Sequence, residues 1–301
     1  MQDQKGELSD MSETYDTRAQ FKLYEHPWLS LIAVMLTTII SMIISTNLLF
    51  RVIGLSQDTV IGRFSQPMFF HILGGFIFAP LVLRLPKGKT SYRQYLSDIG
   101  LSNTQPFVKL VLLALSCSIF LLLSQAASSF VFRFLEGQSI TMNFIRYVFD
   151  LSEDLPPNSF NLLTTIPSVF EEIGFRGIAL TVFLNKYPER KSIVYSSVGF
   201  GVMHFLNLAF GRELVWVIGQ VIWAFIFGLF YGYVFVRTKS LLPSMIVHYM
   251  SNVFVDSLAG YMQSNASTFI WAVYGVVFSY GIVPTTLMIL WARYFMSKYF
   301  Q

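Results

Sequence analysis

The 301-residue chain is too apolar for a soluble protein, because 54% of its residues are hydrophobic, 17% are aromatic and only 13% are charged. Its mean hydropathy is +0.55, whereas soluble domains carry about 25% charged residues. We therefore predict an all-α, polytopic membrane protein. The net charge of +4 is explained by basic loops and gives no reason to expect a nucleic-acid partner. The single cysteine, Cys117, excludes a disulfide framework and is expected to be a small packed residue.

Eight stretches of the chain are apolar over about 20 residues, the length that crosses roughly 30 Å of hydrocarbon. They lie near residues 28–50, 67–84, 107–133, 159–184, 190–210, 214–236, 241–260 and 268–296. We therefore expect about eight transmembrane helices. The first stretch follows a polar segment and has no small-residue cleavage site behind it, which indicates a membrane anchor and not a removed signal peptide. Residues 1–27 are then a cytoplasmic tail, and residues 28–301 form a single transmembrane domain.

The connections between these stretches differ in their content of Lys and Arg. Most basic residues lie on the set of connections that includes both termini, and the opposite set carries only Arg51, Arg63, Arg133, Arg146 and Arg212. Because basic residues accumulate on the cytoplasmic side, both termini are predicted to lie in the cytoplasm. A bacterial plasma membrane is the expected location. Two connections, 86–106 and 134–158, are expected to carry short amphipathic helices.

The segment "FEEIGFRG", residues 170–177, places three ionisable groups inside the fourth apolar stretch. Each would oppose insertion by about 2.5–3.5 kcal/mol at mid-bilayer, so each needs a partner inside the bundle. Glu172 and Arg176 are spaced i, i+4 with the acid first, which favours a helical ion pair. Glu171 is rotated by about 100° on an ideal helix and points elsewhere. Glu171 is therefore expected to find its partners on other helices.

Two histidines in later apolar stretches are the expected partners of Glu171. His204 lies in "GFGVMHF", and His248 lies in "VHYMSN", where Asn252 follows on the same helix face. Helix rise from the nearest cytoplasmic basic residue gives depths of roughly 22 Å for Glu171, 20 Å for His204 and 13 Å for His248. These depths allow the three side chains to meet inside the bundle, in the half nearer the cytoplasm.

An acid, two imidazoles and a carboxamide suit amide hydrolysis, which needs a base for water, a proton donor for the leaving amine and donors for the oxyanion. Glu171 is expected to be the base, helped by His204, and His248 with Asn252 would stabilise the oxyanion. The alternative is a divalent metal such as zinc, held by Glu171, His204 and His248 and activating its bound water. The spacing differs from H-E-x-x-H, so it does not by itself indicate a metal.

Three motifs in order, EExxxR at Glu171, Glu172 and Arg176, FxxxH at Phe200 and His204, and HxxxN at His248 and Asn252, resemble the CPBP intramembrane proteases. That family comprises CAAX prenyl endopeptidases and bacteriocin-processing or self-immunity proteins, and the resemblance covers about residues 159–258. It implies an eight-helix fold with the active site inside the bundle. It also implies that Glu171 and His204 activate water and that His248 and Asn252 form the oxyanion site. Glu172, Arg176 and Phe200 would support them.

The resemblance implies an intramembrane endopeptidase, metal-dependent or glutamate-dependent, whose substrate is a hydrophobic or lipidated peptide or protein. A second hypothesis is a non-catalytic regulator or bacteriocin self-immunity protein that binds a membrane-protein partner. Proton-coupled transport also uses buried Glu and His, but no repeated half is evident. A structural alternative for Glu171, Glu172 and Arg176 is a buried ion-pair cluster that only stabilises the packing of the helices. His71 and the GxxxG of Gly228 and Gly232 are interpreted as packing features, and Asp256 as an interfacial residue.

Overall fold

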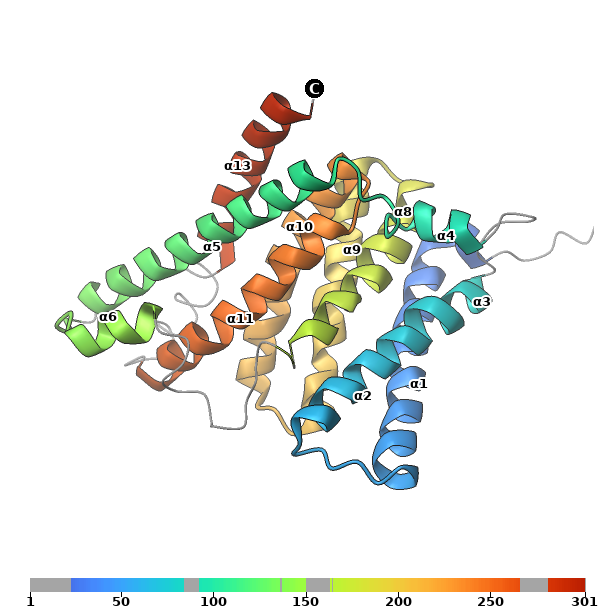
Figure 1. Ribbon diagram of the computed structural model, residues 1–301, viewed down its shortest axis with the longest axis horizontal. Helices are drawn as coiled ribbons and strands as arrows, with labels where there is room; N and C mark the ends of the chain where they lie inside the picture. Colours follow the sequence, from blue (N-terminus) through green and yellow to red (C-terminus); the bar gives the residue numbers. More distant parts are fainter. Residues whose placement is uncertain are drawn as a thin grey trace, which may run out of the picture.

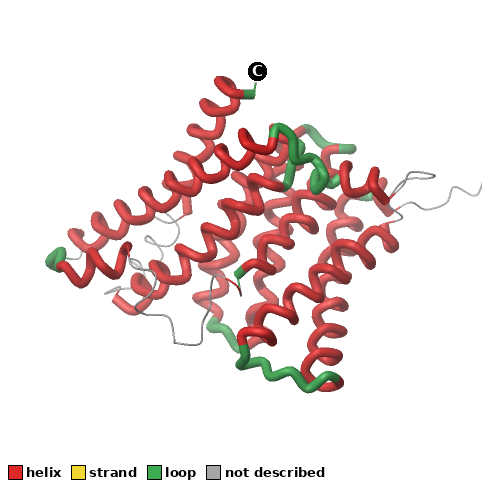
Figure 2. The backbone as a smooth tube through the Cα atoms, viewed as in Figure 1, coloured by secondary structure: helices red, strands yellow, loops and turns green. Residues whose placement is uncertain are grey.

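The computed structural model describes residues 23–83, 92–135, 137–149, 163, 165–265 and 281–300. Every regular element within these ranges is helical, and the helices pack beside one another (Figures 1 and 2). The all-α prediction is therefore confirmed. Most of the expected tail, residues 1–22, lies outside the described residues, and the described chain begins with a 3₁₀ turn at Leu23–Glu25.

The helices have the following bounds in chain order. They are α1 (Pro27–Thr46), α2 (Val60–Ile72), α3 (Ala79–Leu83), α4 (Tyr92–Asp98), α5 (Phe107–Leu135), α6 (Met142–Phe149), α8 (Thr181–Leu184), α9 (Glu189–Met203), α10 (Leu214–Thr238), α11 (Leu242–Asn265) and α13 (Val283–Tyr299). Wider π-helical turns continue or join some of them: η2 (Asn47–Val52), η3 (Leu73–Phe78) and η5 (Ile173–Leu180). Tighter 3₁₀ turns form η4 (Ile166–Phe170) and η6 (His204–Phe210).

Five helical stretches of the described part are long and apolar enough to cross a membrane. They are Pro27–Val52, Val60–Leu83, Phe107–Leu135, Glu189–Phe210 and Leu214–Thr238. They coincide with five of the eight expected spans, although the second begins earlier than the expected 67–84. The expected count of eight is not reached within the described residues.

The other three expected spans differ from a continuous apolar helix in distinct ways. The 159–184 stretch changes geometry from η4 to η5, and its first residues lie outside the described part. The 241–260 stretch forms one helix, α11, but polar residues such as His248 and Asn252 lower its hydropathy. Residues 266–280 are not described, and α13 has only 17 residues.

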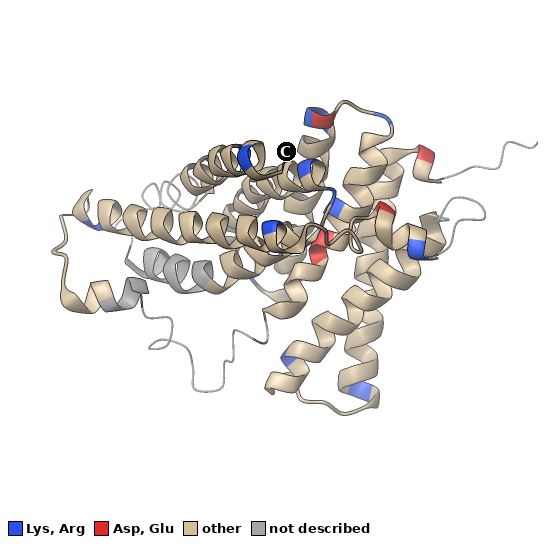
Figure 3. Ribbon diagram, turned by 45° about the horizontal axis from the view of Figure 1, so that its top comes forward, with Lys and Arg blue, Asp and Glu red and all other residues tan. Residues whose placement is uncertain are grey.

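Charged residues lie mostly toward the ends of the long helices, whose middle portions are largely free of Lys, Arg, Asp and Glu (Figure 3). Both short amphipathic helices expected in the connections are present within the described ranges. The one in 86–106 is α4, which buries Tyr95 and leaves Tyr92 exposed, and Ile99 directly after it is also buried. The one in 134–158 is α6, and residues 150–158 lie outside the described part.

The second half of the chain provides most of the main core. α9 packs along α10, and α5 packs against both α11 and α13 (Figure 1). The GxxxG of α10 brings α9 close: a Cβ added at Gly232 would lie 3.0 Å from Ile193 Cγ2, and one at Gly228 would lie 2.9 Å from Ser197 Cβ. The packing interpretation of these glycines is confirmed, and Cys117 is a buried free thiol in the same core.

Candidate active site

The segment that carries the two glutamates changes helical geometry at the glutamates themselves. Pro167 lies in the first positions of the 3₁₀ turn η4, Glu171 closes that turn, and Glu172 precedes the π-helical turns of η5. Glu171 is half-buried, whereas Glu172 and Arg176 are fully buried. Arg176 Nη1 donates to Glu172 Oε1 across 3.0 Å. The ion pair predicted from the i, i+4 spacing is confirmed.

Glu172 also makes a hydrogen bond with His248, although the sequence analysis predicted that His248 would lie beside Glu171. His248 Nδ1 lies 2.9 Å from Glu172 Oε1, the same oxygen that accepts from Arg176. His248 is buried on α11, so this contact joins α11 to the EExxxR segment. Glu171 was expected to be the partner of both histidines. For His248 this is wrong, because Glu172 and not Glu171 makes the hydrogen bond to its Nδ1.

Aromatic rings surround the Arg176 guanidinium. Its Cζ lies 4.1 Å from the centroid of the Phe200 ring and 5.1 Å from that of Tyr231. A guanidinium over an aromatic face is attracted by the ring quadrupole, which partly offsets its desolvation. A Cβ added at Gly228 would lie 3.1 Å from Arg176 Nη2. The glycine therefore leaves room for the guanidinium beside α10.

His204 lies at the junction of α9 and η6, where the helix tightens. Its Nδ1 is 2.8 Å from the carbonyl oxygen of Phe200, and its ring meets the Phe200 ring edge to face at 5.0 Å. The ring is half-buried, and it interacts electrostatically with the Glu171 carboxylate. The structure thus brings Glu171 and His204 into one neighbourhood, with Phe200 packed next to His204.

Asn252 lies one helical turn after His248 on α11. Its Nδ2 donates to Ser168 Oγ across 2.9 Å, which ties α11 to η4. Phe200 reaches toward this side of the site as well, since its ring centroid is 5.9 Å from that of His248. All seven motif residues therefore lie within one set of packed elements, η4, η5, α9, η6 and α11.

Four residues that the sequence analysis did not assign to the site also lie against it. The Tyr231 ring stacks on His248 with centroids 5.2 Å apart and an interplanar angle of 19°. Ser251 Oγ donates to the His248 carbonyl across 2.8 Å and lies 2.9 Å from the Tyr231 hydroxyl. Buried His71 interacts electrostatically with His248. The fourth is Ser168. A polar residue in an apolar stretch was the available signal for each, but such residues are common in helix packing.

The metal hypothesis requires Glu171, His204 and His248 to converge on one point. His204 and His248 each direct Nδ1 to an acceptor, as metal-bound histidines do, and this orientation would suit metal binding through Nε2. However, among the described residues no three His, Cys, Asp or Glu side chains form a group that would hold an ion. The described side chains therefore do not present the three-ligand geometry that the metal hypothesis requires.

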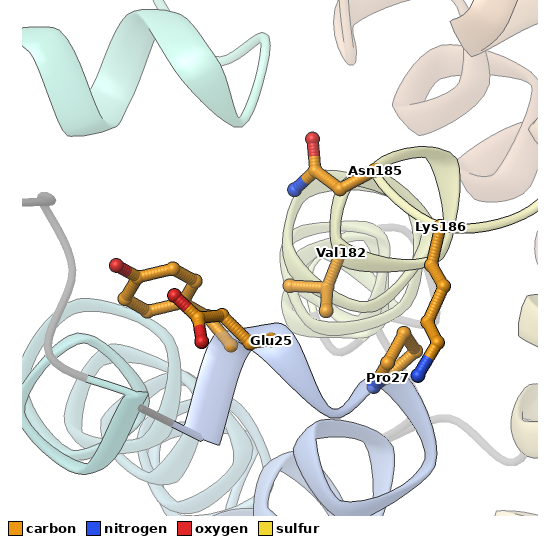
Figure 4. A pocket seen from close by; sticks show the side chains of 6 residues that line it. Glu25, Pro27, Val182, Asn185 and Lys186 are labelled. Carbon is orange, nitrogen blue, oxygen red and sulfur yellow. The ribbon is translucent and has the colours of Figure 1, made fainter. Parts of the chain in front are cut away.

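A surface pocket of about 320 Å³ lies between the start of α1 and the end of α8 (Figure 4). Its lining residues are Tyr24, Glu25, Pro27, Val182, Asn185 and Lys186. None of them belongs to the three motifs. The pocket is therefore separate from the intramembrane residues that carry the candidate chemistry.

Comparison with known proteins agrees with the motifs. A family model described as type II CAAX prenyl endopeptidase Rce1-like matches residues 156–254, a range that contains every motif residue from Glu171 to Asn252. A search of curated proteins gave no match, and neither did a search of solved structures. Residues 156–254 are therefore similar to the Rce1-like CAAX prenyl endopeptidase family. Together with the five apolar helices long enough to span a bilayer, this similarity indicates an integral membrane protein.

Proposed function

We propose that this chain is an intramembrane endopeptidase that hydrolyses a peptide bond in a hydrophobic or lipidated peptide or protein. The family match supports the reaction class. In this proposal residues 28–301 form one transmembrane domain with its family core at about 159–258. Both termini lie in the cytoplasm of a bacterial cell, and the site opens toward the cytoplasmic half of the bilayer.

The observation that carries the proposal is the environment of His204. The Phe200 carbonyl can only accept a hydrogen bond, so His204 Nδ1 must carry the proton of the bond between them. The neutral ring then presents a lone pair at Nε2. Glu171 lies nearby and is half-buried, and its carboxylate makes no hydrogen bond within the described part of the chain. A free carboxylate and a free imidazole nitrogen are the acceptors that water activation needs.

His248 suits the opposite task. Its Nδ1–H donates a hydrogen bond to the Glu172 carboxylate. In the proposed role His248 Nε2 carries a proton as well, and that N–H donates to the developing oxyanion. The second N–H of the Asn252 carboxamide would provide another donor. Arg176 holds the Glu172 carboxylate in place and balances its charge.

The proposed reaction follows from these roles. Water loses a proton to the pair of Glu171 and His204, and its oxygen attacks the scissile carbonyl carbon. The carbonyl oxygen becomes an oxyanion between His248 and Asn252. The abstracted proton then passes to the amide nitrogen, the carbon–nitrogen bond breaks, and a carboxylic acid and an amine are released, after which the acid loses its proton to solvent.

Purified protein in lipid nanodiscs, incubated with a library of hydrophobic and prenylated peptides, tests the proposal. Mass spectrometry should show cleavage by the wild type, and Glu171→Ala and His204→Ala should each abolish it without loss of folded protein. Glu189→Gln is the control, because Glu189 pairs with Arg237 at an exposed position outside the motifs. Parallel reactions with chelator separate metal-dependent from metal-free hydrolysis.

Full activity in either site variant would overturn the assignment. The non-catalytic alternative, a regulator or self-immunity protein, predicts that Ala at Glu171, His204 and His248 leaves the cellular phenotype intact. Glu171 is half-buried beside His204, and this position favours a catalytic role over a purely structural one. A charge that only holds helices together is expected to be fully paired.

A further inference from the structure

Ser168 makes two hydrogen bonds that together determine how the Asn252 carboxamide is oriented. It lies on η4, three residues before Glu171, and its hydroxyl donates to the Thr165 carbonyl oxygen across 2.7 Å. Asn252 Nδ2 approaches the same hydroxyl oxygen at 2.9 Å. The bond crosses from η4 to α11, so it is made only when these two elements are packed together.

The direction of the second bond follows from the first. A serine hydroxyl has one proton, and here the Thr165 carbonyl takes it, because a carbonyl oxygen can only accept. Ser168 Oγ therefore has lone pairs, and no proton, left for Asn252. Only the NH₂ group of the carboxamide can satisfy it. An amide turned by 180° would place Oδ1 against Oγ, with no hydrogen between the two oxygens.

This bond leaves the other N–H of the Asn252 amide unengaged. Nδ2 carries two protons, and Asn252 makes no second side-chain hydrogen bond within the described part of the chain. Asn252 follows His248 by one helical turn, so the free N–H lies on the helix face that carries the His248 ring. An oxyanion between these residues would meet a donor from the amide, and a turned amide would present a repulsive oxygen lone pair instead.

We propose that Ser168 is a positioning residue that fixes the donor orientation of the Asn252 carboxamide in the oxyanion site. The proposal rests on the endopeptidase function proposed above. Without the Ser168 hydroxyl the amide rotates between two orientations, of which one stabilises the transition state. The loss falls on the chemical step, because the ground-state carbonyl needs the donor far less than the oxyanion does.

Steady-state cleavage by the full chain in nanodiscs tests this role. Ser168→Ala should lower kcat by about tenfold with KM changed by less than about twofold, a smaller loss than the roughly 100- to 1000-fold that follows removal of an oxyanion donor itself. Ser118→Ala is the matched control, because Ser118 is a buried serine of α5 that donates to its own helix at Ala114. It should keep wild-type kcat and show a similar thermal stability to Ser168→Ala.

A double-mutant cycle with Asn252→Ala decides between positioning and general structural support. If Ser168 acts through Asn252, adding Ser168→Ala to Asn252→Ala should cause no further loss. Affinity for a phosphinic peptide, which mimics the tetrahedral intermediate, gives the same cycle without turnover. Unchanged kcat in Ser168→Ala, or an equal additional loss in the Asn252→Ala background, would overturn the proposal. Either result can be obtained while the wild type still cleaves in a Glu171-dependent way, so the proposed function is judged separately.

Discussion

His248 Nδ1 and Glu172 Oε1 lie 2.9 Å apart inside the bundle, and the same carboxylate oxygen accepts from Arg176. The two adjacent glutamates of the EExxxR motif therefore occupy different environments. Glu172 is fully buried and shared between a guanidinium and an imidazole, whereas Glu171 is half-buried beside His204. Glu172 thus connects Arg176 to the proposed oxyanion site, and Glu171 remains available for the proposed activation of water.

Neutralising each glutamate separately should have different consequences. Glu172→Gln leaves the buried Arg176 charge without its counter-ion, which destabilises a protein by about 3–5 kcal/mol when one partner of a buried pair is removed. Glu171→Gln leaves that pair intact and should keep the wild-type melting temperature while abolishing cleavage. Thermal unfolding in detergent and the peptide assay measure both effects. Equal melting temperatures for the two variants would contradict the division of roles.

Tyr231 should support His248 mainly through its ring. Tyr231→Phe keeps the stacked ring and removes one hydrogen bond to Ser251, which we expect to lower stability by about 1 kcal/mol with kcat nearly unchanged. Tyr231→Leu removes the stacking surface and should reduce kcat by about tenfold or more, because small displacements of a catalytic group are costly. Comparison of kcat and melting temperature in both variants is the measurement. A larger kcat loss in the Phe variant would show that the hydroxyl matters more.

The sequence predicted the contacts that are local and missed those that depend on tertiary packing. Glu172 and Arg176 are one helical turn apart, so their ion pair follows from helix geometry alone. The bond from His248 to Glu172 joins residues 76 positions apart, and that from Asn252 to Ser168 joins residues 84 apart. Which glutamate faces α11 depends on the switch from 3₁₀ to π-helical turns at residues 170–173. An ideal-helix projection does not contain that switch.

Tertiary packing also explains part of the difference between the eight spans expected from the sequence and the five apolar helices of the described part. Pro27–Val52 and Phe107–Leu135 are apolar over a length sufficient to cross a membrane. α11 carries the site residues His248, Ser251 and Asn252 on a helix that packs against α5 and α10. A helix lined by other helices tolerates polar side chains that a lipid-facing helix does not. The low hydropathy of α11 is therefore compatible with a position among other helices of the bundle.

The two glycines of α10 offer a matched pair of substitutions. Gly228→Ala places a methyl group 3.1 Å from Arg176 Nη2 as well as against Ser197, so it should displace the guanidinium and lower both stability and activity. Gly232→Ala places its methyl group 3.0 Å from Ile193 Cγ2, outside the motifs. Overpacking of this kind destabilises by about 1–3 kcal/mol. Both variants should melt earlier, and only Gly228→Ala should have a reduced kcat per folded molecule. Equal kcat in both variants would exclude an effect through Arg176.

Tyr95 should stabilise the junction between α2 and α3 by completing a backbone hydrogen bond. In the π-helical turns of η3 the Ala79 N–H bonds to the Gly74 carbonyl, so the next carbonyl, that of Gly75, is aligned with Pro80, which has no N–H. Tyr95 on α4 replaces the missing donor, since its hydroxyl donates to the Gly75 carbonyl across 2.6 Å. Burial raises the pKa of the Tyr95 phenol well above its usual value, so the hydroxyl remains a donor at alkaline pH.

Tyr95→Phe should therefore lower the free energy of unfolding by about 1–3 kcal/mol, because the Gly75 carbonyl loses the donor that the buried Tyr95 side chain provides. Tyr92 provides the control: its hydroxyl donates to the Phe76 carbonyl across 3.0 Å, but its side chain is 47% exposed. Water can replace the Tyr92 hydroxyl, so Tyr92→Phe should change stability by less than about 0.5 kcal/mol. Unfolding of both variants by denaturant in detergent micelles measures the difference. Equal destabilisation would mean that burial of the hydrogen bond at Gly75 does not determine its contribution.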